Sequence, residues 1–442
     1  MFQNQPFKFI FFLVLAVPFL LINGCSADRR MANNLNKIFK NSKLNEDSQV
    51  GFTIAAPDGK KAIYEKNAHK YFTPASNAKL LTFYAALKII PDSIPSLRYI
   101  ERGDSLIFWG TGDPSFLQSR LKGVKAYNFL KNSGKKLFFA AGRYTGSFYG
   151  PGWAWDDYND YYQAEINELP LMDNLAYIKA EGNKLAVSPQ LFADCFKKDS
   201  LSVAKDFKVT RKFDSNDFEY PVIDAPDGYE QYIPYKTSVN STLSLLADTL
   251  NLPVQLITME MPVNAKTIYG MKTEEVLREM MLPSDNFIAE QLLLVCANQF
   301  QRDLNGAVAI DHINKEYLSA LPDPLNWVDG SGLSRMNLVT PADMITLLSL
   351  IYKEVNNKEL LFSLLPAGGK SGTLKNAYPK TNQPFVFGKT GSLSNNYNQS
   401  GYVTTKKGMV FLFSFMNNHF VTPTATVRNE MVRIMTHIHE KF

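Results

Sequence analysis

The hydrophobic pattern of the first hundred residues predicts a spacer, a hairpin and a helix. Residues 26–48 are mostly polar, which indicates a spacer that leads into a short helix. Strand-like runs then cover residues 49–56 and 61–65, with a turn at Asp58-Gly59. From Ser76 to Ile90 the apolar residues recur at helical spacing, and Pro91 ends the run.

The stretch from residue 96 to residue 262 has a different character, because short strand-like runs dominate it. They cover residues 105–109, 136–140, 176–180, 184–187 and 207–213. Glu181-Gly182-Asn183 has the composition of a hairpin turn, aromatic residues are dense from Tyr144 to Tyr162, and residues 241–250 have helical spacing. We predict that residues 96–262 form a β-rich insertion.

The last stretch alternates helical and strand-like patterns. Helices are predicted at residues 273–281, 287–300 and 342–355, strands at 385–387, 401–405 and 409–416, and an amphipathic closing helix at 427–439. Strands at both ends of the chain with helices between them predict an α+β fold with a composite sheet. Residues 25–95 and 263–442 would then form one domain around the insertion.

Composition narrows the class of protein. The chain has 442 residues, which favours more than one domain, and 45% apolar with 20% charged residues is ordinary for a globular protein. The formal charge is 47 − 42 = +5, without a Lys/Arg tract, so the sequence does not indicate a nucleic-acid partner.

The N-terminus has the pattern of a targeting signal. Lys8 precedes an apolar run over residues 9–22, followed by Asn23-Gly24-Cys25-Ser26. This resembles a bacterial lipoprotein signal, so we expect residues 1–24 to be removed and Cys25 to be lipidated. The alternative is an ordinary signal peptide cut elsewhere. Lipidation would anchor the protein to a membrane of the cell envelope, on the periplasmic side.

The two other cysteines, Cys195 and Cys296, lie far apart in the sequence. We expect two independent buried thiols and no disulfide.

Three short motifs carry the candidate chemistry. They are Ser76-Asn77-Ala78-Lys79 at a helix start, Ser284-Asp285-Asn286 before another helix, and Lys389-Thr390-Gly391 after a strand. Each alone is as compatible with a helix cap, a solvated side chain or a polar turn. The ordered set is the signature of penicillin-binding proteins and serine β-lactamases.

The residue types suit acyl transfer. Lys79 shares a helix face with Ser76 and, with a pKa lowered by burial and by Lys389, can take the proton of the serine hydroxyl. A helix N-terminus at Ser76 favours developing negative charge. Ser284 can relay a proton to the leaving amine and Asn286 can hold a substrate amide. Lys389 and Thr390 suit a terminal carboxylate, by charge and by hydroxyl donation. Gly391 and Ser392 beside them are further candidates for substrate binding.

Other chemistries have weaker support in the sequence. None of the five histidines has metal-ligand spacing with a carboxylate or cysteine partner, and no glycine-rich phosphate loop of the required spacing occurs. The residues therefore indicate neither a metal site nor a phosphate-binding loop.

Over nearly the whole mature chain, the sequence resembles the class C low-molecular-mass penicillin-binding proteins, of the penicillin-binding protein 4 type. Besides the three motifs, the blocks that carry the resemblance are Gly110–Pro114, Gly152–Asp157, Asp329–Arg335, Gly372–Leu374 and Ser400–Tyr402. The gap of 284 − 76 = 208 residues between the first two motifs agrees with the family's insertion.

The resemblance implies a serine D,D-peptidase that acts on peptidoglycan stem peptides and needs no metal or organic cofactor. It would cleave D-Ala-D-Ala bonds or D-amino acid cross-links through acylation at Ser76, and β-lactam antibiotics would inhibit it covalently. It also implies an acid in the insertion that selects a free amine of the stem peptide, best matched by Asp157, with Asp156 as the alternative. The alternative is that both acids are simply solvated and have no role in substrate selection.

The sequence leaves two alternative functions and the type of peptidase action open. A β-lactamase would share Ser76, Lys79 and Lys389, and a non-catalytic wall-binding scaffold is a third class of function. The sequence does not decide between carboxypeptidase and endopeptidase action.

Overall fold

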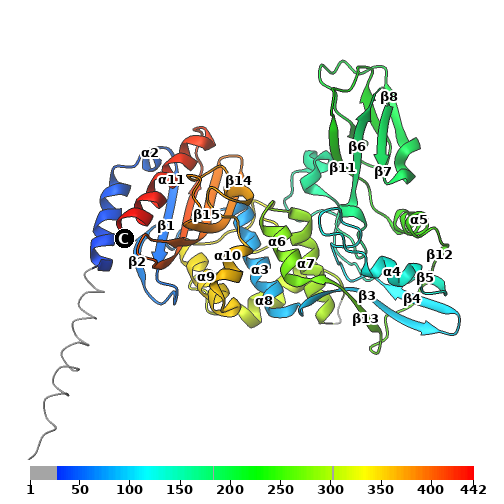
Figure 1. Ribbon diagram of the computed structural model, residues 1–442, viewed down its shortest axis with the longest axis horizontal. Helices are drawn as coiled ribbons and strands as arrows, with labels where there is room; N and C mark the ends of the chain where they lie inside the picture. The colour runs from blue at the N-terminus through cyan, green and yellow to red at the C-terminus, as the bar shows by residue number, and fades with distance from the viewer. Residues whose placement is uncertain (1–26, 183, 301–302) are drawn as a thin grey trace, which may run out of the picture.

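The computed structural model describes residues 27–182, 184–300 and 303–442. The predicted signal peptide and Cys25 lie outside these residues. The ribbon is elongated, with the C-terminus near one end and the inserted strands at the other (Figure 1). No helix within the described ranges is both long and apolar enough to cross a membrane.

A five-stranded antiparallel sheet joins the two ends of the chain, in the order β14-β15-β16-β1-β2. β1 pairs with β16 from Gln49 opposite Asn418 to Ala55 opposite Leu412, so the predicted composite sheet is confirmed. The strands are β1 Gln49–Ala55, β2 Ala62–Lys66, β14 Val386–Leu393, β15 Asn396–Thr404 and β16 Val410–Asn418.

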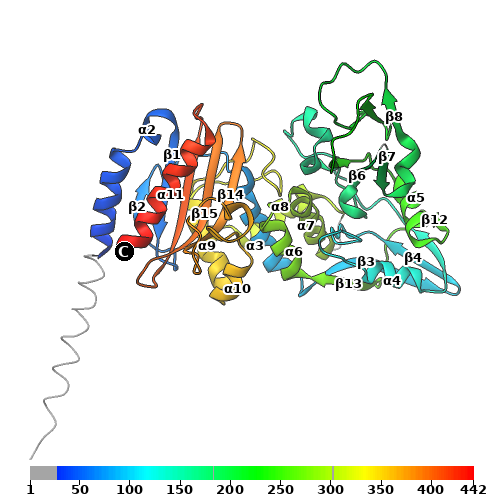
Figure 2. The same cartoon turned by 45° about the horizontal axis from the view of Figure 1, so that its top comes forward.

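Helices cover both faces of this sheet (Figures 1 and 2). On one face lie a helix over residues 27–40 and α11 (Thr424–Lys441), which share a core with Phe52 and Phe415. The helices of the second core are α3 Lys79–Ile89, α6 Thr273–Met281, α7 Asn286–Gln299, α8 Gly306–Tyr317, α9 Pro341–Val355 and α10 Lys358–Ser363. Both faces of the sheet are therefore buried, which explains why β15 and β16 are buried along almost their whole length.

The prediction of a polar spacer before the sheet was wrong for residues 27–40. Met31, Leu35 and Phe39 recur every four residues and are 2% exposed or less, so this segment is a core-facing helix. A further short helix, α2 (Leu44–Asp47), follows it. The many asparagines between the apolar positions hide the helical pattern.

The inserted part begins and ends in two neighbouring strands. β3 (Ser93–Arg102) and β13 (Lys266–Lys272) are antiparallel and form one edge of a sheet ordered β12-β5-β4-β3-β13. β3 begins three residues before the expected limit of 96, and β13 lies wholly beyond the expected limit of 262. The limits were missed because pairing between distant segments leaves no mark in the local pattern. The other strands are β4 Ser105–Trp109, β5 Lys136–Phe139 and β12 Val254–Leu256, and the helices are α4 Lys125–Lys131 and α5 Val239–Leu250.

Two three-stranded sheets complete the inserted part, ordered β11-β6-β7 and β8-β10-β9. Glu181 pairs with Lys184, so the predicted hairpin is confirmed. The strand expected at residues 207–213 shrinks to two residues in β9, because the Gln231 side chain bonds the backbone N–H and carbonyl of Val209 in place of a strand. The strands are β6 Leu175–Glu181, β7 Lys184–Ser188, β8 Phe196–Asp199, β9 Thr210–Arg211, β10 Phe218–Pro221 and β11 Glu230–Pro234.

The two described cysteines are both free, as predicted. Cys296 is buried inside α7, whereas Cys195 is only half-buried. The expectation of burial therefore holds for Cys296 alone.

Candidate active site

Ser76 lies in a short 3₁₀ turn, Ala75–Ala78, that leads directly into α3. Two glycines press against this turn. A side chain at Gly332 would collide with the Ala75 carbonyl, and one at Gly391 would collide with the Pro74 carbonyl. The backbone of Ser76 is therefore held between the loop of residues 329–335 and strand β14.

The first two motifs meet at the side chain of Lys79, which is 0% exposed. Its Nζ donates to Ser76 Oγ at 3.0 Å, to Asn286 Oδ1 at 2.6 Å and to the Ser331 carbonyl at 2.7 Å. The ammonium group thus has three acceptors, and one of them is the predicted nucleophile.

Burial lowers the pKa of Lys79 to about 8, while the carboxylates of Asp285, Glu290 and Asp329 act in the opposite direction. Burial, and then repulsion by Lys79, lower the pKa of Lys389 well below its ordinary value. The expected effect of burial on Lys79 is therefore present, whereas the repulsion between the two lysines acts on Lys389.

The third motif lies within β14, and the prediction that it follows a strand was wrong. Lys389 pairs with Ser400 of β15, and the ladder continues to Leu393, although the apolar pattern stops at Phe387. Backbone pairing extends the strand through residues that the hydrophobic pattern leaves out.

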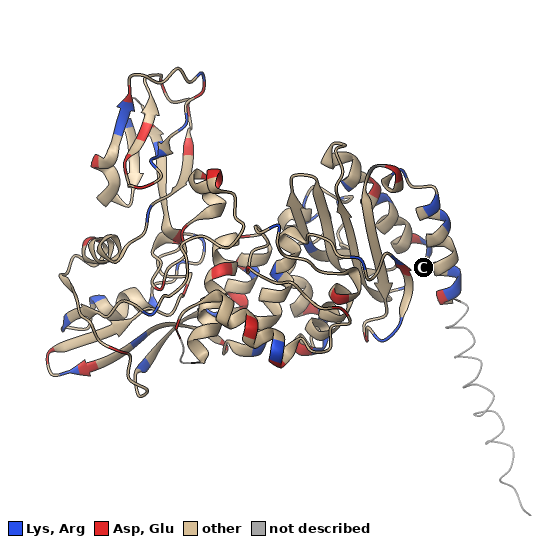
Figure 3. Cartoon of the chain, turned by 180° about the vertical axis from the view of Figure 1, so that it is seen from behind, with Lys and Arg blue, Asp and Glu red and all other residues tan. Residues whose placement is uncertain are grey.

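Lys389 is the one Asp, Glu, Lys or Arg residue on β14, β15 and β16, whose ribbons are almost free of charge colour in Figure 3. Its Nζ donates to the Thr390 carbonyl at 2.7 Å, and Thr390 Oγ1 donates to Thr373 Oγ1 at 2.7 Å. Ser392 is exposed one residue beyond the buried Gly391.

The second motif forms the turn before α7. Ser284 has a φ of +67°, and Asp285 Oδ1 caps α7 by accepting from the Ile288 N–H at 2.9 Å. The other oxygen of Asp285 is ion-paired with Arg120 of the inserted part. These contacts hold Ser284, which is half-buried, at the edge of a cavity of about 290 Å³ that Asn286 also lines.

The segment that contains Asp157 borders this site. Asn286 Nδ2 donates to the Tyr162 carbonyl at 3.0 Å, and Trp153 Nε1 donates to Asp329 Oδ2 at 2.9 Å. Asp157 is half-buried, and burial is the main cause that raises its pKa. The described contacts do not join Asp157 directly to the three motifs, and Asp156 is exposed.

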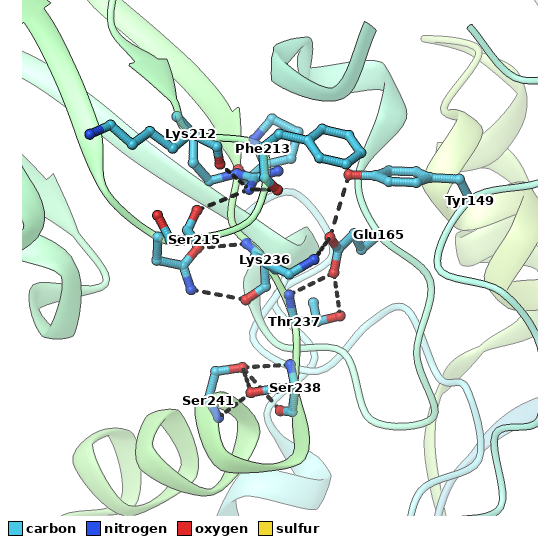
Figure 4. Close-up of polar contacts among 12 residues, drawn as sticks. Tyr149, Glu165, Lys212, Phe213, Ser215, Lys236, Thr237, Ser238 and Ser241 are labelled. Carbon is cyan, nitrogen blue, oxygen red and sulfur yellow. Dashed lines mark hydrogen bonds and ion pairs between the residues drawn. The ribbon is translucent and has the colours of Figure 1, made fainter. Parts of the chain in front are cut away.

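Buried polar groups of the inserted part support the same segment. Tyr158 donates its hydroxyl to the Arg211 carbonyl at 2.9 Å, and Asn159 bonds the same residue. Next to it, Glu165 accepts from the Thr237 N–H at 2.7 Å and from the Thr237 hydroxyl at 2.8 Å (Figure 4).

Two residues near Lys79 were not predicted from the sequence as part of the site. Ser331 was noticed only as part of a family block, and Glu290 was not noticed at all. A carboxylate in the apolar run Phe287–Phe300, one helical turn after Asn286, was the available signal.

Comparison with known proteins adds an independent line of evidence. The model of the "D-Ala-D-Ala carboxypeptidase 3 (S13) family" matches residues 31–219 and 258–438, well over half of the chain. A curated relative, D-alanyl-D-alanine carboxypeptidase DacB of Haemophilus influenzae, is 26% identical, and the alignment covers 87% of this chain and 89% of that protein.

The fold has solved counterparts. The crystal structure of penicillin binding protein 4 (dacB) from Haemophilus influenzae matches with a TM-score of 0.74 and 21% identity, covering 92% of this chain and 99% of that one. The same protein complexed with a novel β-lactam matches with a TM-score of 0.68, the same identity and the same coverage.

The expected α+β fold and the resemblance are therefore both confirmed. The chain belongs to the D-Ala-D-Ala carboxypeptidase 3 (S13) family, whose members are serine-type hydrolases.

Proposed function

We propose that this protein cleaves the D-Ala-D-Ala bond of peptidoglycan stem peptides through an acyl-enzyme on Ser76. The observation that carries the proposal is the 3.0 Å contact between Lys79 Nζ and Ser76 Oγ, together with the lowered pKa of Lys79. Neutral Lys79 takes the hydroxyl proton as Ser76 Oγ attacks the carbonyl carbon.

The rest of the cycle uses the second motif and the start of α3. Backbone N–H groups at the helix start stabilise the oxyanion. Ser284 relays a proton to the amine of the departing D-alanine as the C–N bond breaks, and Asn286 holds the substrate amide. Water then hydrolyses the ester and returns Ser76 to its free form.

The third motif receives the terminal carboxylate. The amine comes from Lys389, and the two hydroxyls come from Thr390 and Ser392. The backbone at Gly391 provides an open edge. Burial and the nearby Lys79 lower the pKa of Lys389, whereas the negative charge of a substrate carboxylate acts in the opposite direction.

Cross-links that end in D-amino acids are substrates of the same kind, and β-lactams imitate the acyl donor. The Haemophilus influenzae protein whose structure holds a β-lactam has the same fold, which supports covalent inhibition here. Asp157 selects stem peptides with a free amine, since its half-buried carboxylate lies in the segment that Tyr162 connects to Asn286.

Mass spectrometry with penicillin tests the nucleophile. The wild-type protein gains the mass of one penicillin, whereas Ser76→Ala gains none. The N-cap of this turn is Pro74, so Ser76→Ala removes no helix cap and the variant should fold normally. Labelling that persists in Ser76→Ala contradicts the proposal.

The same samples separate the alternatives. An adduct that hydrolyses within seconds favours a β-lactamase, and a long-lived adduct favours a peptidase. Purified muropeptides that remain uncut favour a non-catalytic scaffold.

Lipidation of Cys25 would place the enzyme on the periplasmic side of a cell-envelope membrane. The sequence Asn23-Gly24-Cys25-Ser26 after an apolar run supports this location. The mature protein should begin at Cys25 and partition with membranes, and Cys25→Ser should block processing or release the protein. A mature N-terminus elsewhere, on protein that does not partition with membranes, rules the anchor out.

A further inference from the structure

A buried carboxylate supports the loop that contacts Lys79. Glu290 lies on α7, one turn after Asn286, and is 6% exposed. Its two oxygens accept from neighbouring peptide groups: Oε2 from the Gly330 N–H at 3.0 Å, and Oε1 from the Ser331 N–H at 2.7 Å. One carboxylate thus holds two consecutive residues of a loop.

That loop provides an acceptor for the catalytic amine. The Ser331 carbonyl receives the hydrogen bond of Lys79 Nζ at 2.7 Å, and the Gly330 carbonyl accepts from Thr82 Oγ1 of α3 at 2.7 Å. A shift of this loop would therefore move an acceptor of Lys79, whose nitrogen must stay within reach of Ser76.

The inserted part holds the same loop through Asp329. Its Oδ1 accepts from the Gly332 N–H at 2.8 Å, and its Oδ2 accepts from the Ser334 N–H at 2.7 Å and from Trp153 Nε1 at 2.9 Å. Trp153 is two residues from the exposed Trp155, in the segment that leads to Asp157. The loop therefore connects the catalytic lysine with the inserted part.

We propose that Glu290 is a positioning residue that fixes Lys79 through the Gly330–Ser331 peptide, and that Trp153 joins the inserted part to this arrangement through Asp329. Neither role belongs to the three motifs. The proposal rests on the function proposed above, in which Lys79 is the base.

The charge of Glu290 has a second effect. Burial, and then the nearby Asp329, raise the pKa of Glu290 to about 7. In its charged form Glu290 raises the pKa of Lys79. The titratable groups that interact with it are Asp329 on the loop, Lys79 on α3 and Tyr144 of the inserted part.

Two substitutions separate the effect of Glu290 on the position of Lys79 from the effect of its charge on the pKa of Lys79. For each variant, penicillin acylation is measured from pH 6 to pH 10. Glu290→Gln keeps the length, removes the charge and leaves one oxygen for two N–H donors. The maximal rate should fall about tenfold or more, and the midpoint of the pH profile should move down by about one unit, because Lys79 loses a neighbouring negative charge. Glu290→Asp keeps the charge but is too short, so the rate should fall without a shift of the midpoint.

Two further variants complete the design. Trp153→Phe keeps an aromatic ring, although a smaller one, and loses the N–H, so kcat on muropeptides should fall about threefold while KM stays unchanged. Glu354→Gln is the matched control, since this carboxylate forms an ion pair with Lys88 at the surface, and both rate and midpoint should stay at wild-type values.

The outcomes are distinct. An unchanged rate in Glu290→Gln, or a lowered rate with an unmoved midpoint, overturns the inference, because the second result indicates a purely structural role. If Glu290→Gln does not fold, wild-type rates in both Glu290→Asp and Trp153→Phe overturn it. A wild-type protein that penicillin does not label overturns the proposed function instead.

Discussion

The catalytic cleft and the inserted part each bury a cation, but of different chemical types. In the cleft, Lys79 is 0% exposed, and its three acceptors include the Ser76 hydroxyl. In the inserted part, Arg211 is 1% exposed, and its Nε donates to the Pro234 carbonyl at 2.8 Å. Its Nη1 donates to the carbonyls of Lys212, Phe213 and Ser215 at 2.7–3.0 Å.

The difference shows that burial of charge does not by itself mark a catalytic group. A guanidinium stays charged, and its planar fork can hold several carbonyls at once, so Arg211 fixes a turn of the inserted part. An amine can lose its proton when burial lowers its pKa, so Lys79 can act as a base. The type of side chain, and whether a nucleophile is among its partners, separate the two roles.

The largest effect is expected from exchanging one cation type for the other in the cleft. Lys79→Arg keeps a positive charge but removes the base, so acylation by penicillin should fall about 10²–10⁴-fold. Stopped-flow measurement with a fluorescent penicillin gives the rate, and thermal unfolding shows that the variant is folded. Acylation within a few-fold of wild type would mean that Lys79 is not the base.

The reverse experiment removes the cation from the inserted part. Arg211→Met leaves several buried carbonyls without a donor and should lower the free energy of unfolding by about 3 kcal/mol. The folded fraction should still react with penicillin at close to the wild-type rate. Urea unfolding followed by tyrosine and tryptophan fluorescence measures the stability.

Lys212→Met is the matched control for Arg211. Lys212 is exposed, and its ion pair with Glu219 is at the surface, so the unfolding midpoint should not change. If Arg211→Met stops acylation in protein that is still folded, the two regions are more closely coupled than the comparison assumes.

A smaller effect is expected from pH. Since Lys79 must be neutral to accept a proton, the acylation rate should rise with pH through about 8 and then level off. At one unit below the midpoint the rate should be about a tenth of the plateau. A profile that is flat between pH 6 and pH 9 would place the base elsewhere.

The smallest effect is expected at the border between the two regions. Asp157→Asn should slow cleavage of amine-bearing muropeptides by about fivefold at most, because a partly exposed ion pair is weak. Penicillin acylation should hardly change. Purified variants are compared on both substrates, with Asp156→Asn as the control. Equal losses on both substrates, or none on either, would remove Asp157 from substrate selection.

The order of elements and the three motifs of the site could both be predicted from the sequence alone. Helical spacing located α6 and α9 to within two residues, since each buries one face, and the apolar run located α7, which is buried on all sides, equally well. The spacing of three residues placed Lys79 over Ser76. The spacing of the motifs also located the insertion, because 208 residues separate Ser76 from Ser284.

The surroundings of Lys79, in contrast, are visible only in the folded chain. Glu290, Ser331 and Trp153 come from three separate stretches of the chain, and the loop at residues 329–335 brings them together. The pairing of β3 with β13, and the extension of β14 through Lys389, also depend on partners that are remote in sequence. Local patterns report which face of an element is buried, whereas hydrogen bonds between distant segments and the pKa values that follow from burial exist only in the folded chain.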